Sequence, residues 1–200
     1  MSLVSVGAEL LAAKERLAPY KNNITVFGSA RIKPSDPLYS DAYEIGKALS
    51  DCGYNIFTGG GPGIMSGANK GAYEGKSKSI GLNIQLPQEQ DSNPYLDEEI
   101  TFSYFFSRKV MLVKYSSACI YFPGGYGTAD ELMEVLTLIQ TKKMAQVPII
   151  LYDSSFWEPL LVWIEQSVKK AYINQKHFKL ITVVDSIEEI VRVVEKEICL

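Results

Sequence analysis

Three glycine-containing turns in this sequence each follow a short apolar run, and together they suggest an anion-binding site. They are Gly28-Ser29, the GGGPG run at 59–63 and the PGGYGT run at 123–128. The last two each open a stretch with helical periodicity. A helix N-terminus presents unpaired backbone N–H groups and a partial positive charge, and glycine lets an anion approach them closely. Two such turns in one sheet favour the interpretation that the glycines bind a phosphate-bearing ligand over the interpretation that they only make tight turns.

Glu131 is the candidate acid that follows the third turn. Thr128-Ala129-Asp130-Glu131 has the pattern of a capping box, in which the threonine caps a helix and the glutamate reaches back to it. Residues 186–189 repeat the pattern without glycines, which predicts an ordinary helix cap there. At 123–131 the glycines predict Glu131 on the first turn of a helix beside the phosphate. The helix dipole favours an ionised carboxylate there, where it would orient water or stabilise a cationic sugar.

Two common nucleotide motifs are absent. The first turn reads GSARIK, and the run from Gly59 has isoleucine at position 64, so neither has the G-x-G-x-x-G spacing of dinucleotide-binding proteins. Gly75-Lys76-Ser77 resembles the end of a P-loop, but lysine stands at position 70, where that motif needs glycine. These differences argue against an NAD dehydrogenase and against a P-loop nucleotidase.

The composition is that of an ordinary globular protein. The chain has 200 residues, 46% of them hydrophobic and 22% charged, which suits a single domain over residues 1–200 with its own core. A net charge of −3 is not typical of a nucleic-acid binder. Cys52, Cys119 and Cys199 form no CxxC pair, which indicates free thiols in a reducing compartment and no structural metal. No apolar run is long enough to span a membrane, so we expect a cytoplasmic protein.

Residues 1–20 predict an amphipathic helix rather than a signal peptide, because they lack a basic start and carry Glu9 within the apolar stretch. We expect this helix to lie on the domain or on a partner subunit. One face of it would carry Leu3, Val6, Leu10, Leu11 and Leu17.

Apolar runs alternate with amphipathic stretches along the rest of the chain. This alternation predicts an α/β fold, Rossmann-like and doubly wound, with a mostly parallel sheet and helices on both faces. Ligands bind such folds outside the carboxyl ends of the strands, where the strand order reverses. The predicted strands are 24–27, 54–57, 79–84, 118–122, 147–152 and 180–184, the predicted helices are 38–49, 64–73, 105–115, 132–141, 157–170 and 187 to about 197, and 87–98 is a polar loop.

The segment PGGYGTADE at 123–131 resembles the PGGxGTxxE motif of the LOG ("lonely guy") family of cytokinin riboside 5′-monophosphate phosphoribohydrolases. The resemblance extends to GSAR at 28–31, GGGPGIM at 59–65 and FSRKVMLVKYS at 106–116, and it covers about residues 24–165. Relatives are often labelled lysine decarboxylases. That label does not fit, because pyridoxal chemistry needs a Schiff-base lysine and no lysine here stands in a recognisable pyridoxal context.

The resemblance implies hydrolysis of the N-glycosidic bond of a purine nucleoside 5′-monophosphate, without a cofactor. It identifies Arg108 and Glu131 as the catalytic pair. A carboxylate near C1 would stabilise an oxocarbenium-like sugar and orient water, and an arginine would hold the phosphate or ribose hydroxyls or stabilise the departing base. The turns and the resemblance together indicate as substrate-binding residues Gly28, Ser29, Gly60, Gly61, Lys109, Gly124, Gly125, Tyr126, Gly127, Thr128, Glu134 and Thr137.

Several alternatives stay open. The substrate is either a cytokinin nucleotide with a prenylated adenine, which would need an apolar pocket, or AMP and similar nucleotides. A non-catalytic carrier resembling molybdenum cofactor carrier proteins needs the glycine turns but not Arg108 and Glu131. A purely structural module leaves the glycine turns without a purpose. The segment 105–115 is apolar on most sides, so it is either a buried core helix or packs on a second subunit; the resemblance implies a homodimer or a higher homo-oligomer.

Overall fold

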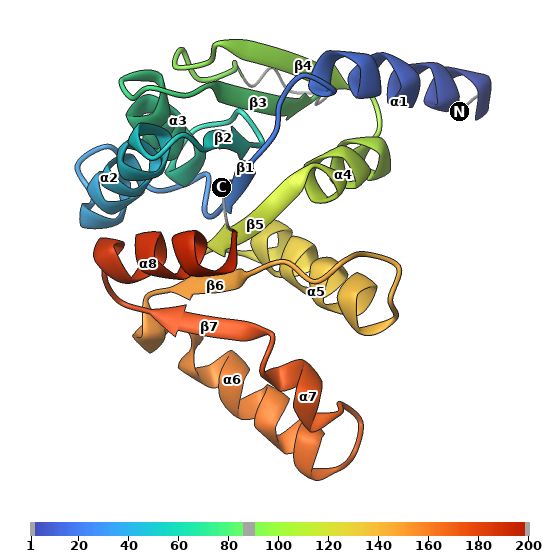
Figure 1. Ribbon diagram of the computed structural model, residues 1–200, viewed down its shortest axis with the longest axis vertical. Helices are drawn as coiled ribbons and strands as arrows, with labels where there is room; N and C mark the ends of the chain where they lie inside the picture. The colour runs from blue at the N-terminus through green and yellow to red at the C-terminus, as the bar shows by residue number, and fades with distance from the viewer. Residues whose placement is uncertain (1–2, 86–90, 199–200) are drawn as a thin grey trace.

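Seven parallel strands form one sheet in the computed structural model, which describes residues 3–85 and 91–198 (Figure 1). The strand order is β4-β3-β2-β1-β5-β6-β7. The chain therefore builds one half of the sheet outward from β1, returns to the middle, and builds the other half outward from β5. This arrangement confirms the predicted Rossmann-like α/β fold. The strands are β1 (Asn23–Phe27), β2 (Asn55–Thr58), β3 (Ser79–Ile84), β4 (Glu98–Phe102), β5 (Ser116–Tyr121), β6 (Ile149–Tyr152) and β7 (Ile181–Val184).

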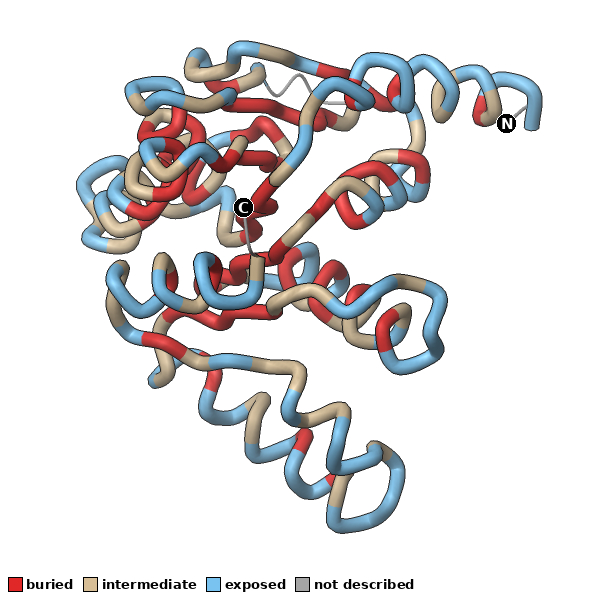
Figure 2. The backbone as a smooth tube through the Cα atoms, viewed as in Figure 1, coloured by how far each residue is buried: buried red, intermediate tan, exposed pale blue. Residues whose placement is uncertain are grey.

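Helices cover both faces of this sheet (Figure 1). Side chains alternate between the faces along each strand, so that Cys119 and Tyr121 of β5 join one apolar core while Ala118 and Ile120 join the other. Buried residues concentrate along the strands (Figure 2). The first core lies under α1 (Leu3–Leu17), α4 (Phe105–Lys114), α5 (Tyr126–Gln140) and α6 (Ser154–Lys169), and the second under α2 (Pro37–Asp51), α3 (Ile64–Tyr73) and α8 (Ile187–Glu197); α7 (Gln175–Phe178) follows α6.

The predicted elements agree with the structure except at three places. The predicted loop 87–98 lies in part outside the described residues, and its last residue begins β4, which the sequence did not predict. Only Ile100 and Phe102 of β4 are buried, because β4 is an edge strand, so its segment lacks the continuous apolar run of the inner strands. The short helix α7 was also missed, and α5 begins at Tyr126 rather than near 132.

Helix α1 is fastened to β4 and to the start of α4. Arg16 Nε donates to Glu98 Oε1 at 2.8 Å. The Glu9 carboxylate accepts from the backbone N–H of Ser103 at 2.6 Å and from the hydroxyl of Ser107. The predicted packing of this helix on the body is thus confirmed at Val6 and Leu17, which are buried, whereas Leu3 and Leu11 are 82% and 62% exposed. None of the helices in the described ranges could cross a membrane.

The three glycine turns meet at the carboxyl ends of the strands. The N–H of Ser29, after β1, donates to the carbonyl of Pro123, after β5, at 3.1 Å, and the carbonyl of Ser29 accepts from Ile64 at the start of α3 at 3.1 Å. A Cβ at Gly63, whose φ is +69°, would lie 2.3 Å from that carbonyl oxygen. Glycine at position 63 is therefore what lets α3 begin against the first turn.

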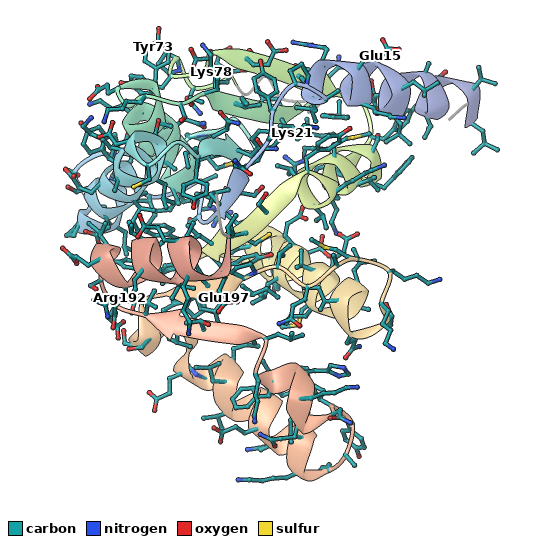
Figure 3. The ribbon with its side chains drawn as sticks, viewed as in Figure 1. Glu15, Lys21, Tyr73, Lys78, Arg192 and Glu197 are labelled. Carbon is teal, nitrogen blue, oxygen red and sulfur yellow. The ribbon has the colours of Figure 1, made fainter. Side chains whose placement is uncertain are left out.

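Because Glu9 accepts hydrogen bonds from two donors at the start of α4, we expect Glu9→Ala to lower the free energy of unfolding by about 1–2 kcal/mol. Urea denaturation measures this change. Glu15→Ala is the control, since Glu15 is an exposed residue of the same helix (Figure 3). Similar unfolding free energies for the two variants would show that the Glu9 contacts do not fasten α1.

Candidate active site

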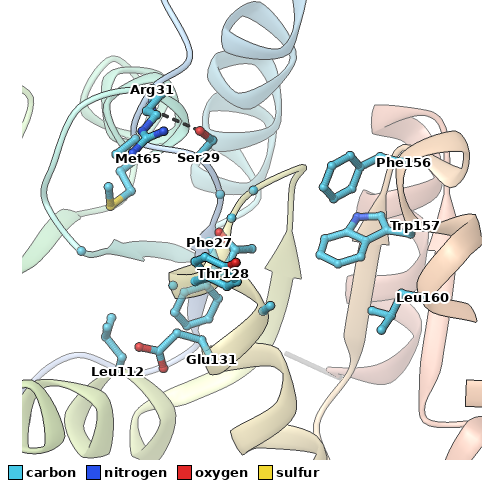
Figure 4. Close-up of a pocket in the computed structure, with 18 of the residues that line it drawn as sticks. Phe27, Ser29, Arg31, Met65, Leu112, Thr128, Glu131, Phe156, Trp157 and Leu160 are labelled. Carbon is cyan, nitrogen blue, oxygen red and sulfur yellow. Dashed lines mark hydrogen bonds between the residues drawn. The ribbon is translucent and has the colours of Figure 1, made fainter. Parts of the chain in front are cut away.

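A cavity of about 980 Å³ opens at the carboxyl ends of β1 and β5, where the strand order reverses. This is the position at which doubly wound folds bind ligands. Figure 4 shows Phe156, Trp157 and Leu160 on the α6 side, and Glu131 pointing away from them toward Leu112. The lining residues are Phe27, Gly28, Ser29, Ala30, Arg31, Gly59, Met65, Arg108, Leu112, Gly124, Gly125, Tyr126, Gly127, Thr128, Ala129, Glu131, Phe156, Trp157, Pro159 and Leu160.

The first turn of α5 lines this cavity. The backbone N–H groups of Tyr126, Gly127 and Thr128 belong to the helix start, where α-helical geometry leaves N–H groups without an intrahelical partner. The next N–H, of Ala129, donates to the carbonyl of Gly125 at 3.0 Å. A Cβ at Gly124 would lie 2.1 Å from Thr128 Oγ1. Glycine at 124 therefore leaves room for the Thr128 side chain beside these donors.

The capping box predicted at Thr128 is wrong. Helix α5 begins at Tyr126, its N-cap is Gly125, and no side chain caps it. Glu131 consequently lies on the second turn of α5 rather than the first. Glycines at the helix start concealed it, because glycine has low helix propensity. The cap predicted at Ser186 is confirmed, since its side chain accepts from a backbone N–H of α8.

Glu131 is a buried acid with an unpartnered oxygen. It is 6% exposed, and among the described residues its Oε2 has no hydrogen-bond partner. Burial raises the pKa of Glu131 from 4.5 to about 7, while the charges of Lys109 and Arg108 lower it and those of Glu134 and Asp130 raise it. A carboxyl group with a pKa near neutrality can both accept and donate a proton, as general acid–base catalysis requires.

Arg108 faces the same cavity from α4. Its guanidinium lies over the Phe105 ring, 5.4 Å from the ring centroid, and a Cβ at Gly59 would lie 3.3 Å from its Nη1. Burial lowers the pKa of Arg108, and the Glu131 charge raises it. Its Nε is buried without a hydrogen-bond partner in the described part of the chain. Buried polar atoms are almost always hydrogen-bonded, so unpartnered atoms on both Arg108 and Glu131 indicate a polar ligand in this cavity.

A smaller cavity of about 200 Å³ also reaches Arg108, and it includes Gly61, Asn83 and Phe105 in its lining. Arg108 is thus shared by the two spaces. Gly60 is not among the described lining residues of either one. Its N–H donates to Thr58 Oγ1 at 2.8 Å and its φ is +70°, so Gly60 shapes the turn rather than the cavity wall.

The structure separates the predicted site residues into two groups. Gly28, Ser29 and the turn 124–128 line the large cavity together with Arg108 and Glu131. Lys109, Glu134 and Thr137 are not among the lining residues in the described ranges. Lys109 Nζ instead lies 2.7 Å from Glu134 Oε2, and the Thr137 hydroxyl donates to the carbonyl of Met133 at 2.7 Å.

Other lining residues were not predicted as site residues. Arg31 lies at the cavity, and its backbone N–H donates to Ser29 Oγ at 3.1 Å. Its position in the GSAR segment at 28–31 could have identified it as a site residue. The apolar wall from α6 had no sequence signal, because only the strand order brings the start of α6 beside β1 and β5. That wall consists of Phe156, Trp157, Pro159 and Leu160.

The raised pKa of Glu131 predicts a pH-dependent stability. Since the pKa is 4.5 ordinarily and about 7 in the folded protein, the folded state binds the proton more tightly, and stability falls as pH rises through this window. We expect the unfolding free energy of the wild type, minus that of Glu131→Gln, to fall across this pH range. The fall should be about 1.4 kcal/mol for each unit by which the pKa of Glu131 in the folded state exceeds its value in the unfolded state. Urea denaturation across this pH range measures it. A pH-independent difference would contradict the prediction, and Glu165→Gln, an exposed glutamate of α6, is the control.

The cavity residues do not fit pyridoxal phosphate. No lysine is among the residues that line either cavity in the described part of the chain, so a Schiff base would lack its amine. Lys109, the lysine beside Arg108, forms ion pairs with Asp130 and Glu134. A decarboxylase reaction through pyridoxal therefore has no support in this site.

Among solved structures, the chain resembles the molybdenum cofactor binding protein of the phototrophic bacterium Rippkaea orientalis. The TM-score is 0.67 at 21% identity, covering 88% of this chain and 96% of that one. The molybdenum cofactor carrier protein of Chlamydomonas reinhardtii gives a TM-score of 0.66 at 23% identity, covering 88% and 97%. At these identities the likeness establishes the fold alone.

Sequence comparisons identify the family. The family model described as "Possible lysine decarboxylase" matches residues 65–194. The chain is 28% identical over 186 residues to the cytokinin riboside 5′-monophosphate phosphoribohydrolase LOG of Oryza sativa subsp. japonica, covering 91% of this chain and 76% of that protein. It is 29% identical over 178 residues to the cytokinin riboside 5′-monophosphate phosphoribohydrolase LOG3 of Arabidopsis thaliana, covering 86% and 81%. Together these matches show that the chain belongs to the LOG family.

Proposed function

We propose that this protein hydrolyses the N-glycosidic bond of a purine nucleoside 5′-monophosphate, releasing the free base and ribose 5-phosphate. The observation that carries the proposal is that Arg108 and Glu131 face one cavity at the start of α5, each with a buried polar atom that has no partner in the described part of the chain. Such a helix start binds anions, and a nearby carboxylate stabilises a cationic sugar. A nucleoside 5′-monophosphate carries both ligand groups: an anionic phosphate and a sugar that becomes cationic when the N-glycosidic bond breaks.

The proposed reaction begins with the phosphate at the backbone N–H groups of 126–128. The bond between C1 of the ribose and the base nitrogen breaks, and its electron pair leaves with the base. Glu131 stabilises the resulting oxocarbenium-like sugar and takes a proton from the attacking water, whose oxygen bonds to C1. That proton passes to the departing base. Arg108, which stays charged, stabilises the negative charge that develops on the base or holds the sugar phosphate.

The substrate class follows from the lining. We propose that a purine stacks on the apolar wall formed by α6, since aromatic and apolar side chains bind flat bases. Phe156 and Trp157 are perpendicular, with ring centroids 5.0 Å apart. Apolar surface on this side would also accommodate a prenyl group on the adenine. Both AMP and prenylated adenine nucleotides are therefore candidate substrates.

A non-catalytic carrier of a phosphate-bearing cofactor is the second candidate function. The solved structures with the same fold include molybdenum cofactor carriers, and the start of α5 would suit any such phosphate. A carrier does not need a buried acid with a pKa of about 7 at the cavity. Glu131 therefore favours the hydrolase.

We expect the protein to release free base from AMP or from isopentenyladenosine monophosphate, detected by chromatography. Glu131→Gln and Arg108→Gln should each lower kcat/KM by about 10²–10⁴-fold, the usual contribution of a general acid–base group or an electrostatic stabiliser. Glu165→Gln and Arg192→Gln are matched controls at exposed positions.

Adenosine should react far more slowly than AMP, since it lacks the group that the start of α5 binds. Equal reaction of adenosine and AMP would refute the phosphate site. Tight binding of AMP without release of base would favour the carrier.

We propose that the protein is a homodimer or a higher homo-oligomer assembled through α4. Phe106 and Val110 lie one turn apart on this helix and are each 43% exposed, and exposed apolar patches commonly mark interfaces. Analytical ultracentrifugation should show that Val110→Glu dissociates the assembly. Val162→Glu, at a 45% exposed position of α6, should not. A monomeric wild type would contradict the proposal.

A further inference from the structure

Lys109 bridges two carboxylates on α5. Its Nζ lies 2.8 Å from Asp130 Oδ2 and 2.7 Å from Glu134 Oε2. The Lys109 side chain is only 16% exposed, whereas that of Asp130 is 65% exposed. A lysine side chain that is mostly buried and contacts two acids is better defined than an ion pair between two exposed side chains, which contributes little.

The bridge connects the two helices that carry the catalytic pair. Lys109 directly follows Arg108 on α4, and its two partners flank Glu131 on α5, one residue before it and three after it. Asp130 and Glu134 are four residues apart, so they lie on one face of the helix.

No other hydrogen bond or ion pair joins α4 to α5 among residues 3–85 and 91–198. Arg108 and Glu131 themselves form no ion pair in those ranges, although each charge affects the pKa of the other group. The relative position of the catalytic pair therefore depends on the Lys109 bridge and on how each helix packs on the sheet.

We propose that Lys109 is a positioning residue: by binding Asp130 and Glu134 it fixes Glu131 relative to Arg108, and it does not bind the substrate. This inference rests on the proposed hydrolysis. Misplacing a reacting group by about 1 Å can cost about 10²-fold in rate, so a bridge between the two helices has direct consequences for kcat. A substrate contact would act mainly on KM instead.

The bridge also sets the charge around Glu131. Removing Lys109 takes away a cation that lowers the pKa of Glu131, whereas removing its partners takes away anions that raise it. The two ways of breaking the bridge therefore move this pKa in opposite directions while disturbing the same geometry. The titratable groups that face Glu131 are Arg108 and Lys109 from α4, Asp130 and Glu134 from α5, and Cys119 and Tyr121 from β5, whose own pKa values are raised by burial.

The experiment compares Lys109→Met with the double variant Asp130→Ala/Glu134→Ala, using AMP as substrate. Both should lower kcat by about 10-fold or more with little change in KM, since both release Glu131 from its position. The limb of the pH–rate profile governed by Glu131 should move to higher pH in Lys109→Met and to lower pH in the double variant. Lys109→Arg should retain most activity, because a guanidinium can bind both carboxylates.

Two results would overturn the inference. One is a large rise in KM in Lys109→Met with an unchanged kcat in the double variant, which would assign Lys109 to the substrate. The other is a wild-type kcat in both variants. Thermal unfolding of each variant separates loss of positioning from loss of folding.

Failure of the proposed function gives a different result, because the wild type would then release no base. In that case, NMR titration of Glu131 in the same proteins tests the bridge without activity. Opposite pKa changes in Lys109→Met and the double variant support it, and unchanged pKa values contradict it.

Discussion

Burying Glu131 and Arg108 beside one cavity costs free energy, because each keeps a polar atom that has no hydrogen-bond partner in residues 3–85 and 91–198. Proteins retain such atoms where a ligand supplies the missing hydrogen bonds. Much of the architecture serves this arrangement. The first core holds α4 and α5 against the same face of the sheet, and the Lys109 ion pairs join the two helices. The raised pKa of Glu131 is a consequence of the same burial.

The glycine turns serve a different purpose at each position. At Gly63 a side chain would strike the backbone of the first turn, and at Gly124 it would strike Thr128. These two glycines allow close approach of backbone and side chain around the cavity. Gly60 holds a left-handed turn and does not line the cavity. The glycines of these turns therefore have two roles: some allow close packing at the wall of the cavity, and others hold the turns that support it.

The comparison with the cofactor carriers shows why a fold does not establish a function. The carrier protein of Chlamydomonas reinhardtii shares this fold at a TM-score of 0.66, and the start of α5 in this chain would suit a phosphate under either function. The two candidate functions differ in whether they require an acid and a guanidinium at the cavity. Only the hydrolase requires the Glu131 carboxylate and the Arg108 guanidinium, so substitutions at these two residues distinguish the two functions.

The sequence by itself determined the alternating elements, the Rossmann-like class and, through its motifs, the LOG family. These depend on local periodicity and on short segments, which a sequence carries directly. Only the tertiary structure revealed β4, the true start of α5 and the α6 wall, because an edge strand, a glycine-rich helix start and a distant helix have weak local signals. The same holds for the ion pairs of Lys109, whose match to the Arg-Lys pair of the LOG family suggested a substrate contact. Its partners lie 21 and 25 residues away in sequence, and only the packing of α4 beside α5 brings them together.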